Sequence, residues 1–170
     1  LTQVAFQGEV LLPAPSWVSY QPQALIVKNK VHWIQTTESS NWFPTAEQLE
    51  NKIQSIKNQN LLLFINSPNN PSGTVCKNLQ EIAEVAKKYR LIILSDEIYS
   101  QLTFDNQYKS ISNFYPEGTI VSTGLSKWCG AGGWRLGFFA IPDQLKVLKN
   151  SLKILSSESF TSVSAPIQYA

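Results

Sequence analysis

The sequence has little of the chemistry that metal sites and disulfide-stabilised folds require. Its 170 residues include two cysteines, Cys76 and Cys129, and a single histidine, His32. This set matches no zinc-binding spacing and no disulfide framework, which favours a reducing compartment, the cytoplasm. We therefore expect no metal site. We also expect both cysteines to behave as small apolar residues and His32 to be structural.

An excess of one charge and long apolar runs are also missing. Fourteen Lys and Arg residues against twelve Asp and Glu residues give a net charge of +2, too small to favour a nucleic acid or a membrane surface as partner. No apolar run is long enough to span a membrane. The sequence also lacks the glycine-rich and serine motifs of P-loop, dinucleotide-binding and serine-hydrolase sites.

What the sequence does contain is an alternation of apolar strands and amphipathic helices. The length of 170 residues indicates one domain, or a piece of a larger one. It is long enough to bury a hydrophobic core, and 43% of its residues are apolar. The pattern predicts a three-layer α/β/α fold whose mostly parallel sheet is covered on both faces. Strands are expected at residues 10–12, 31–36, 61–65, 91–94, 119–122 and 136–141, and helices after residues 16, 45, 78 and 143.

Three helix starts carry local signals. Ser16 is expected to cap a helix that begins at Trp17, and Pro22 either kinks that helix or marks its true first turn. T-A-E-Q at Thr45 is a capping-box pattern. Asn78 is expected to cap the following helix.

Polar side chains follow three of the predicted strands where each ends. Asn70 follows the predicted strand at residues 61–65. Asp96 and Tyr99 follow the strand at 91–94, and Ser126 and Lys127 follow the strand at 119–122. Ligands of parallel α/β sheets bind beyond the carboxyl ends of the strands. We therefore expect these side chains to converge on one crevice.

The stretch from Ser122 to Gly137 is predicted to be a loop between two buried strands. A lysine at a strand end in apolar surroundings can have its ammonium desolvated, which makes the amine a nucleophile toward carbonyls, and Lys127 is that candidate. Arg135 follows glycines that let the backbone approach a ligand, and its planar fork suits a phosphate or carboxylate. Trp134 beside it is interpreted as a packing residue.

An amine, a carboxylate, a phenol, an amide and an arginine at strand ends suit an aldehyde cofactor that carries a phosphate and a pyridine ring. The motifs P-S-W-V-S-Y, N-S-P-N-N-P-S-G, S-D-E-I-Y and S-K-x5-G-W-R-x-G occur in this order. From about Glu9 to its end the chain resembles fold-type I pyridoxal-phosphate enzymes, specifically the class I/II aminotransferases of the aspartate aminotransferase type.

The resemblance implies a role for each matching residue, with pyridoxal 5'-phosphate as cofactor. Lys127 would form the aldimine and then move the substrate's alpha proton. Asp96 would pair with the pyridine nitrogen, so that the ring accepts electrons. Asn70 and Tyr99 would hydrogen-bond the cofactor's phenolic oxygen, and Trp17 would stack on the ring.

The resemblance also implies that Ser126 and Arg135 hold the phosphate. Some relatives carry a second phosphate-binding hydroxyl where this chain has Gly124, and Thr123 is the candidate substitute. Taken singly, each residue also has an ordinary interpretation: Asn70 as a turn residue, Asp96 as a helix cap, and Trp17 and Tyr99 as packing aromatics.

The implied activity is transfer of an amino group between an amino acid, of the aspartate type or aromatic, and a 2-oxo acid. Since family members are more than twice as long, residues 1–170 would be a fragment of the cofactor-binding large domain. The glycine-containing phosphate loop and the C-terminal small domain would be missing, and a second subunit would complete the site of a homodimer.

Three alternatives remain open from the sequence. The same cofactor residues serve beta-lyases and cyclopropane-forming synthases on this fold. An aminotransferase-like domain can also be the ligand-sensing part of a transcription regulator. Finally, residues 1–170 by themselves could be catalytically inactive.

Overall fold

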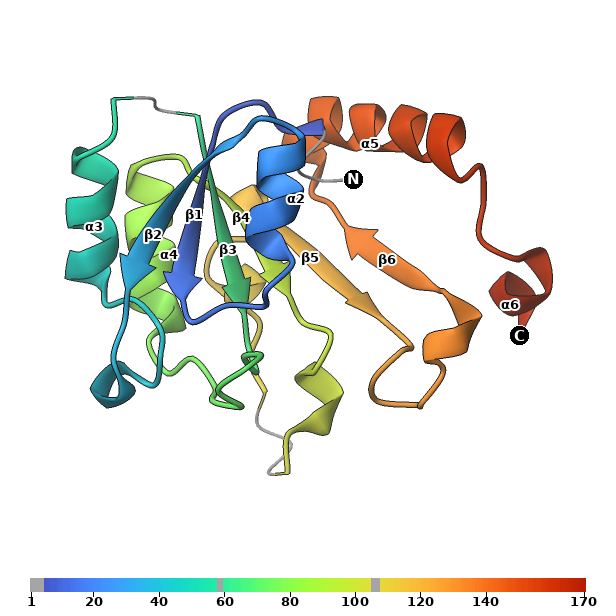
Figure 1. Cartoon of the computed structure of the whole chain (residues 1–170), viewed down its shortest axis with the longest axis horizontal. Helices are drawn as coiled ribbons and strands as arrows, with labels where there is room; N and C mark the ends of the chain where they lie inside the picture. The colour runs from blue at the N-terminus through green and yellow to red at the C-terminus, as the bar shows by residue number, and fades with distance from the viewer. Residues whose placement is uncertain (1–4, 58–59, 105–107) are drawn as a thin grey trace.

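A single mixed sheet organises the molecule (Figure 1). The structure is a computed structural model that describes residues 5–57, 60–104 and 108–170. Within these residues the strand order is β2-β1-β3-β4-β5-β6, with every neighbouring pair parallel except β5 and β6. The strands are β1 (Glu9–Ala14), β2 (Lys30–Gln35), β3 (Leu61–Asn66), β4 (Ile92–Asp96), β5 (Thr119–Gly124) and β6 (Gly137–Ala140).

Helices cover both faces of the sheet and make the predicted three layers. The α-helices are α2 (Tyr20–Ile26), α3 (Ala46–Gln54), α4 (Leu79–Lys88), α5 (Lys146–Ser159) and α6 (Ala165–Tyr169). Short 3-10 turns are η1 (Glu38–Ser40), η2 (Ser100–Leu102), η3 (Ile111–Asn113), η4 (Pro116–Gly118), η5 (Gly132–Trp134) and η6 (Asp143–Leu145). The α/β fold class with a mostly parallel sheet is therefore confirmed.

Alternation along the strands divides the core between the two faces. In β3, Leu63 and Ile65 join one hydrophobic cluster with α3 and α4. The neighbouring Leu62 and Phe64 join the other cluster with α2 and α5. Successive side chains of a strand point to opposite faces, so a strand that is apolar at every position supplies both layers.

The central strand should be sensitive to loss of volume. Leu63 is fully buried, so Leu63→Ala leaves a cavity, and we expect it to lower the free energy of unfolding by about 2–5 kcal/mol. Ile154, on the outer side of α5, is 64% exposed, and Ile154→Ala should change that free energy by no more than about 0.5 kcal/mol. Urea denaturation measures both, and equal losses would contradict the assigned core.

The capping box at Thr45 is confirmed. The Gln48 amide N–H donates to the Thr45 hydroxyl at 3.1 Å, and the Thr45 amide N–H donates to the Gln48 side chain at 2.9 Å. Asn78 does occupy the N-cap position of α4. Its side-chain amide, however, donates to the Pro44 carbonyl at 2.9 Å, so it ties α4 to the start of α3 instead of capping its own helix.

The predicted cap at Ser16 is wrong. The Ser16 hydroxyl donates to the Pro13 carbonyl, and the residues after it form a turn in which the Tyr20 N–H donates to the Trp17 carbonyl at 3.2 Å. Because this turn comes first, α2 begins at Tyr20, and Pro22 lies in its first turn. The alternative interpretation of Pro22 is the correct one.

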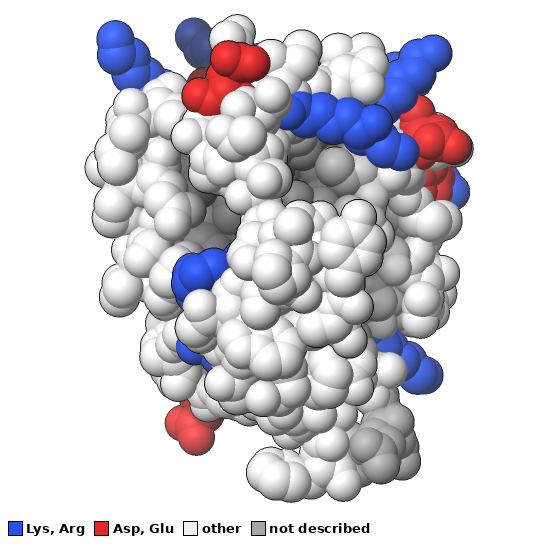
Figure 2. Space-filling view, turned by 90° about the vertical axis from the view of Figure 1, so that its right-hand side faces the viewer, with Lys and Arg blue, Asp and Glu red and all other residues white. Residues whose placement is uncertain are grey.

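The predicted burial of the strand after the loop is also wrong, since all residues of β6 are exposed. Phe138 is 54% and Phe139 is 39% exposed, because β6 lies at the edge of the sheet and an open hollow lies between Phe139 and α5. Figure 2 shows this side of the molecule, whose centre carries few charged side chains. The helix expected after residue 143 is present as α5, and its Leu148 and Leu152 pack into the second cluster.

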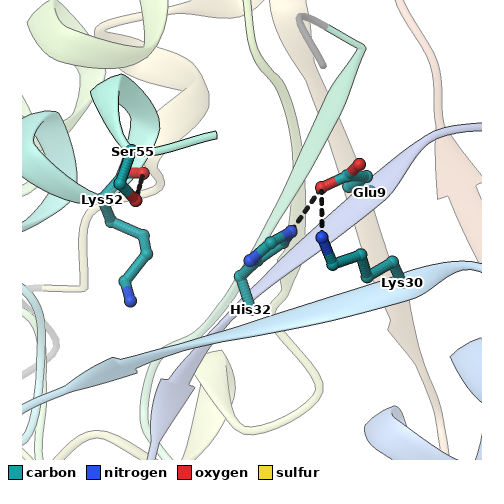
Figure 3. A network of polar contacts seen from close by, with 5 residues as sticks. All are labelled: Glu9, Lys30, His32, Lys52 and Ser55. Carbon is teal, nitrogen blue, oxygen red and sulfur yellow. Dashed lines mark hydrogen bonds and ion pairs between the residues drawn. The ribbon is translucent and has the colours of Figure 1, made fainter. Parts of the chain in front are cut away.

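The single histidine lies near the amino ends of β1 and β2 (Figure 3). The His32 imidazole is hydrogen-bonded to the Glu9 carboxylate, and the Lys30 ammonium is 4.0 Å from the same carboxylate. This group joins the two strands at the end of the sheet opposite the predicted site, in agreement with a structural role.

No described helix is both long and apolar enough to cross a bilayer.

Candidate active site

A cavity of about 270 Å³ lies where β3, β4 and β5 end. We call it the strand-end cavity. Its walls come from segments that are far apart in the sequence but adjacent in the sheet. Its lining residues are Trp17, Tyr20, Asn66, Asn70, Asp96, Ile98, Tyr99, Ser122, Thr123 and Lys127.

The predicted convergence at the strand ends is confirmed for most of the candidate residues. Lys127 and Asp96 line the same cavity, together with Asn70, Tyr99 and Trp17. The order β3-β4-β5 explains this meeting, because parallel strands present their carboxyl ends at one edge of the sheet. Their individual roles remain predictions.

Asp96 is the half-buried acid of this cavity. The Tyr20 hydroxyl donates to its Oδ2 at 2.5 Å, and the Ile98 amide N–H donates to its Oδ1 at 3.3 Å. The Asn66 side-chain amide holds the Asp96 backbone carbonyl at 2.9 Å. Removal from water raises the pKa of the Asp96 carboxyl group, and the hydrogen bonds from Tyr20 and Ile98 oppose that rise.

Asn70 and Tyr99 form a polar pair beside it. The Asn70 amide donates to the Tyr99 hydroxyl oxygen at 3.3 Å. The backbone N–H of Asn70 donates to the Asn66 side chain at 2.8 Å, which fixes the loop after β3. An amide and a phenol are thus placed so that both can donate to one oxygen of a bound molecule.

Lys127 lies at the rim of the strand-end cavity. Its ammonium nitrogen is 5.9 Å from the centroid of the Tyr99 ring. The side chain is exposed, so the predicted desolvation of this amine is not found. The physical reason is its place in the loop that follows β5, where residues 127–130 are all exposed.

Trp17 contributes an aromatic wall. Its indole meets the Tyr20 ring edge-on, with centroids 5.3 Å apart and planes at 85°. The side chain remains 39% exposed. Part of its surface is therefore available to stack on a flat ring.

Arg135 and Ser126 are not among the described residues that line the strand-end cavity. Arg135 lines a neighbouring hollow of about 640 Å³ next to β6, and this outer hollow shares Ser122 and Thr123 with the strand-end cavity. The guanidinium of Arg135 donates to the Gly132 carbonyl at 2.7 Å. Its backbone has a left-handed φ of 55°, which a non-glycine residue adopts at a cost.

Tyr20, Asn66 and Ser122 line the cavity but were missed in the sequence. Asn66 and Ser122 could have been found, because they stand directly at the ends of the predicted strands. Tyr20 gave a weaker signal. It follows Trp17 by three residues, and a turn between them brings both to the same cavity.

Comparison with known proteins decides the family. The family model described as "Aminotransferase class I and II" matches residues 1–170. The chain belongs to the class I and II aminotransferase family. An aspartate aminotransferase of Pyrococcus horikoshii is 38% identical over 162 residues, which cover 90% of this chain and 40% of that protein. An aromatic-amino-acid aminotransferase 2 of Thermococcus litoralis is 37% identical over 141 residues, covering 79% of this chain and 35% of that protein.

A solved structure supports the same conclusion. The aspartate aminotransferase from Thermus thermophilus with maleate superposes with a TM-score of 0.87 at 29% identity, over 99% of this chain and 44% of that one. The chain thus spans roughly two fifths of the length of such aminotransferases.

Aminotransferase membership implies pyridoxal phosphate as cofactor, and the strand-end cavity fits this group. A half-buried carboxylate suits a protonated ring nitrogen, and the Asn70–Tyr99 pair suits a phenolic oxygen. Trp17 offers a stacking surface, and Lys127 places a primary amine at the rim. The polar side chains of the cavity therefore match the polar atoms of the cofactor, and Trp17 matches its flat ring.

Proposed function

We propose that the protein transfers an amino group between an amino acid and a 2-oxo acid, with pyridoxal 5'-phosphate bound in the strand-end cavity. The observation that carries this proposal is the presence of the Lys127 amine and the Asp96 carboxylate in one cavity of a chain from this family. When bound, the cofactor supplies an electron sink for the bonds at the substrate's alpha carbon.

Asp96 holds a proton at the ring nitrogen. To do so the carboxylate must be ionised, and the donors from Tyr20 and Ile98 favour that form against the effect of burial. Asn70 and Tyr99 hydrogen-bond the phenolic oxygen, and Trp17 covers one face of the ring. Together these residues orient the cofactor.

Lys127 has two tasks. Its primary amine would hold the cofactor's aldehyde at the rim of the cavity, and it would also take the proton from the substrate's alpha carbon and return it. An exposed lysine side chain at the rim has the freedom to serve in both positions.

We assign the phosphate to the wall between the strand-end cavity and the outer hollow. Ser122 and Thr123 line both spaces, so a phosphate there has hydroxyl donors nearby. Arg135 lines the outer hollow and Ser126 belongs to the loop after β5, and we propose that both reach the phosphate when it is bound. Thr123 takes the place of the hydroxyl that Gly124 lacks.

The names of the relatives indicate the substrate class, and we propose an aspartate-type or aromatic amino acid as donor. We also propose that the protein acts in the cytoplasm as a homodimer, with residues 1–170 supplying the cofactor-binding large domain. Exposed apolar residues beside the outer hollow, including Trp134 at 47% and Phe160 at 53%, offer a surface for further protein.

A product assay separates amino transfer from the other chemistries of this fold. The protein is incubated with pyridoxal 5'-phosphate, L-aspartate or L-phenylalanine, and 2-oxoglutarate. We expect a new 2-oxo acid and glutamate in equal amounts. Release of ammonia or thiol from a suitable substrate, without glutamate, would instead indicate a lyase.

A further inference from the structure

The nearest side-chain partner of the cavity's acid comes from a different layer of the fold. Tyr20 is the first residue of α2, and its hydroxyl lies 2.5 Å from Asp96 Oδ2, at the end of β4. The two residues are 76 positions apart in the sequence. The other carboxylate oxygen accepts the Ile98 N–H from the turn that follows the strand.

The Tyr20 ring is held in place by its neighbours. It is only 4% exposed. The Phe64 ring of β3 packs against it with centroids 4.8 Å apart, and Trp17 meets it edge-on at 5.3 Å. Because the ring is enclosed, the direction of its hydroxyl toward Asp96 is fixed before any ligand binds.

The electrostatics make Tyr20 a hydrogen-bond donor. Burial and the nearby Asp96 charge raise the pKa of the Tyr20 hydroxyl far above its ordinary value, so the phenol keeps its proton. A donor stabilises the ionised form of a carboxyl group. Tyr20 therefore lowers the pKa of Asp96, whereas removal from water raises it.

We propose that Tyr20 is a positioning residue that keeps Asp96 ionised and aimed at the ring nitrogen of the bound cofactor. This inference rests on the proposed function, because it concerns the strength with which Asp96 holds that nitrogen. Tyr20 acts through Asp96, while Asp96 itself contacts the cofactor.

Other titratable groups lie near Asp96 and are the same in all variants of the test below. They are Tyr99 from the turn after β4, Glu97 beside it in the chain, Tyr108 before η3, and Lys127 after β5. Comparing Tyr20→Phe in the presence and absence of the Asp96 carboxylate therefore isolates the hydrogen bond between these two residues.

The test is a double-mutant cycle on cofactor affinity, with Tyr20→Phe, Asp96→Asn and the double variant. A hydrogen bond to a charged group contributes about 1.5–3 kcal/mol, so Tyr20→Phe should weaken binding of pyridoxal 5'-phosphate at least about tenfold in the unaltered background. In the Asp96→Asn background the same change should weaken binding less than about twofold. Equal weakening in both backgrounds would overturn the inference.

The pH dependence of affinity separates this role from simple packing. Binding should weaken as falling pH protonates Asp96. Tyr20→Phe raises the pKa of Asp96, so the loss should begin at a higher pH in this variant. A loss of affinity that is the same at every pH would identify Tyr20 as a packing residue only.

Tyr89→Phe is the matched control. The Tyr89 hydroxyl also donates to a carboxylate, Glu50 Oε1 at 2.8 Å, but between α3 and α4. Its removal should leave cofactor affinity unchanged, and a tenfold loss would overturn the inference.

A measurement without cofactor keeps the inference distinct from the proposed function. Tyr20→Phe should lower the free energy of unfolding more at neutral pH than at a pH low enough to protonate Asp96. If the unaltered protein bound no pyridoxal 5'-phosphate, the proposed function would fall and the cofactor part of the inference with it. If it bound the cofactor while Tyr20→Phe lacked the pH-dependent loss of stability, only the inference would fall.

Discussion

Lys127→Ala is expected to abolish the visible absorbance of the bound cofactor and to lower the rate of amino transfer by about 10⁴-fold or more. Loss of a positioned proton-transfer group alone costs about 10²–10⁴ in rate, and this variant would also lose the proposed covalent attachment. Because Lys127 is exposed, its removal should change the free energy of unfolding by less than about 0.5 kcal/mol. Spectrophotometric titration, steady-state kinetics and urea denaturation measure the three quantities.

Lys109→Ala is the control, since Lys109 is also an exposed lysine in a loop but is not among the residues that line the strand-end cavity. It should keep both the absorbance and the activity. Normal absorbance in Lys127→Ala would remove Lys127 from its proposed role.

Asp96→Asn should have the next largest effect. It removes the negative charge that we propose to hold the ring nitrogen, and loss of one preorganised electrostatic partner costs on the order of 10²–10³ in rate. The free energy of unfolding, unlike the rate, should not fall at neutral pH. Since burial raises the pKa of Asp96 in the folded protein, its contribution to stability is complete below its unfolded pKa and is lost as pH rises through the folded pKa.

At neutral pH the variant should therefore be at least as stable as the unaltered protein, and this advantage should disappear on acidification. Thermal or urea unfolding across the acidic range measures it. Asp143→Asn is the control, because the Asp143 side chain is 97% exposed. A stability loss in Asp96→Asn at neutral pH, or full activity, would contradict the assignment.

The fold was largely predictable because its strands are encoded locally. Leu61–Asn66 is apolar at nearly every position, which is the pattern of a strand buried on both faces. Thr45 and Gln48 mark a helix start by contacts within one turn. The rule that parallel strands end at one edge then placed Asp96 and Lys127 in a single cavity.

The remaining features depend on contacts between distant parts of the chain. The exposure of β6 follows from its place at the edge of the sheet, which an apolar run cannot reveal. Tyr20 meets Asp96 only after α2 has packed on β1 and β2, which brings its first side chain to Phe64 of β3 and to the end of β4. The position of Arg135 in the outer hollow results from the loop geometry around η5.

The most direct test of the account is a crystal structure of the protein with pyridoxal 5'-phosphate. We expect the ring in the strand-end cavity, with its nitrogen within hydrogen-bonding distance of the Asp96 carboxylate and its aldehyde carbon next to Lys127 Nζ. A cofactor bound elsewhere, or a ring whose nitrogen points away from Asp96, would contradict the account.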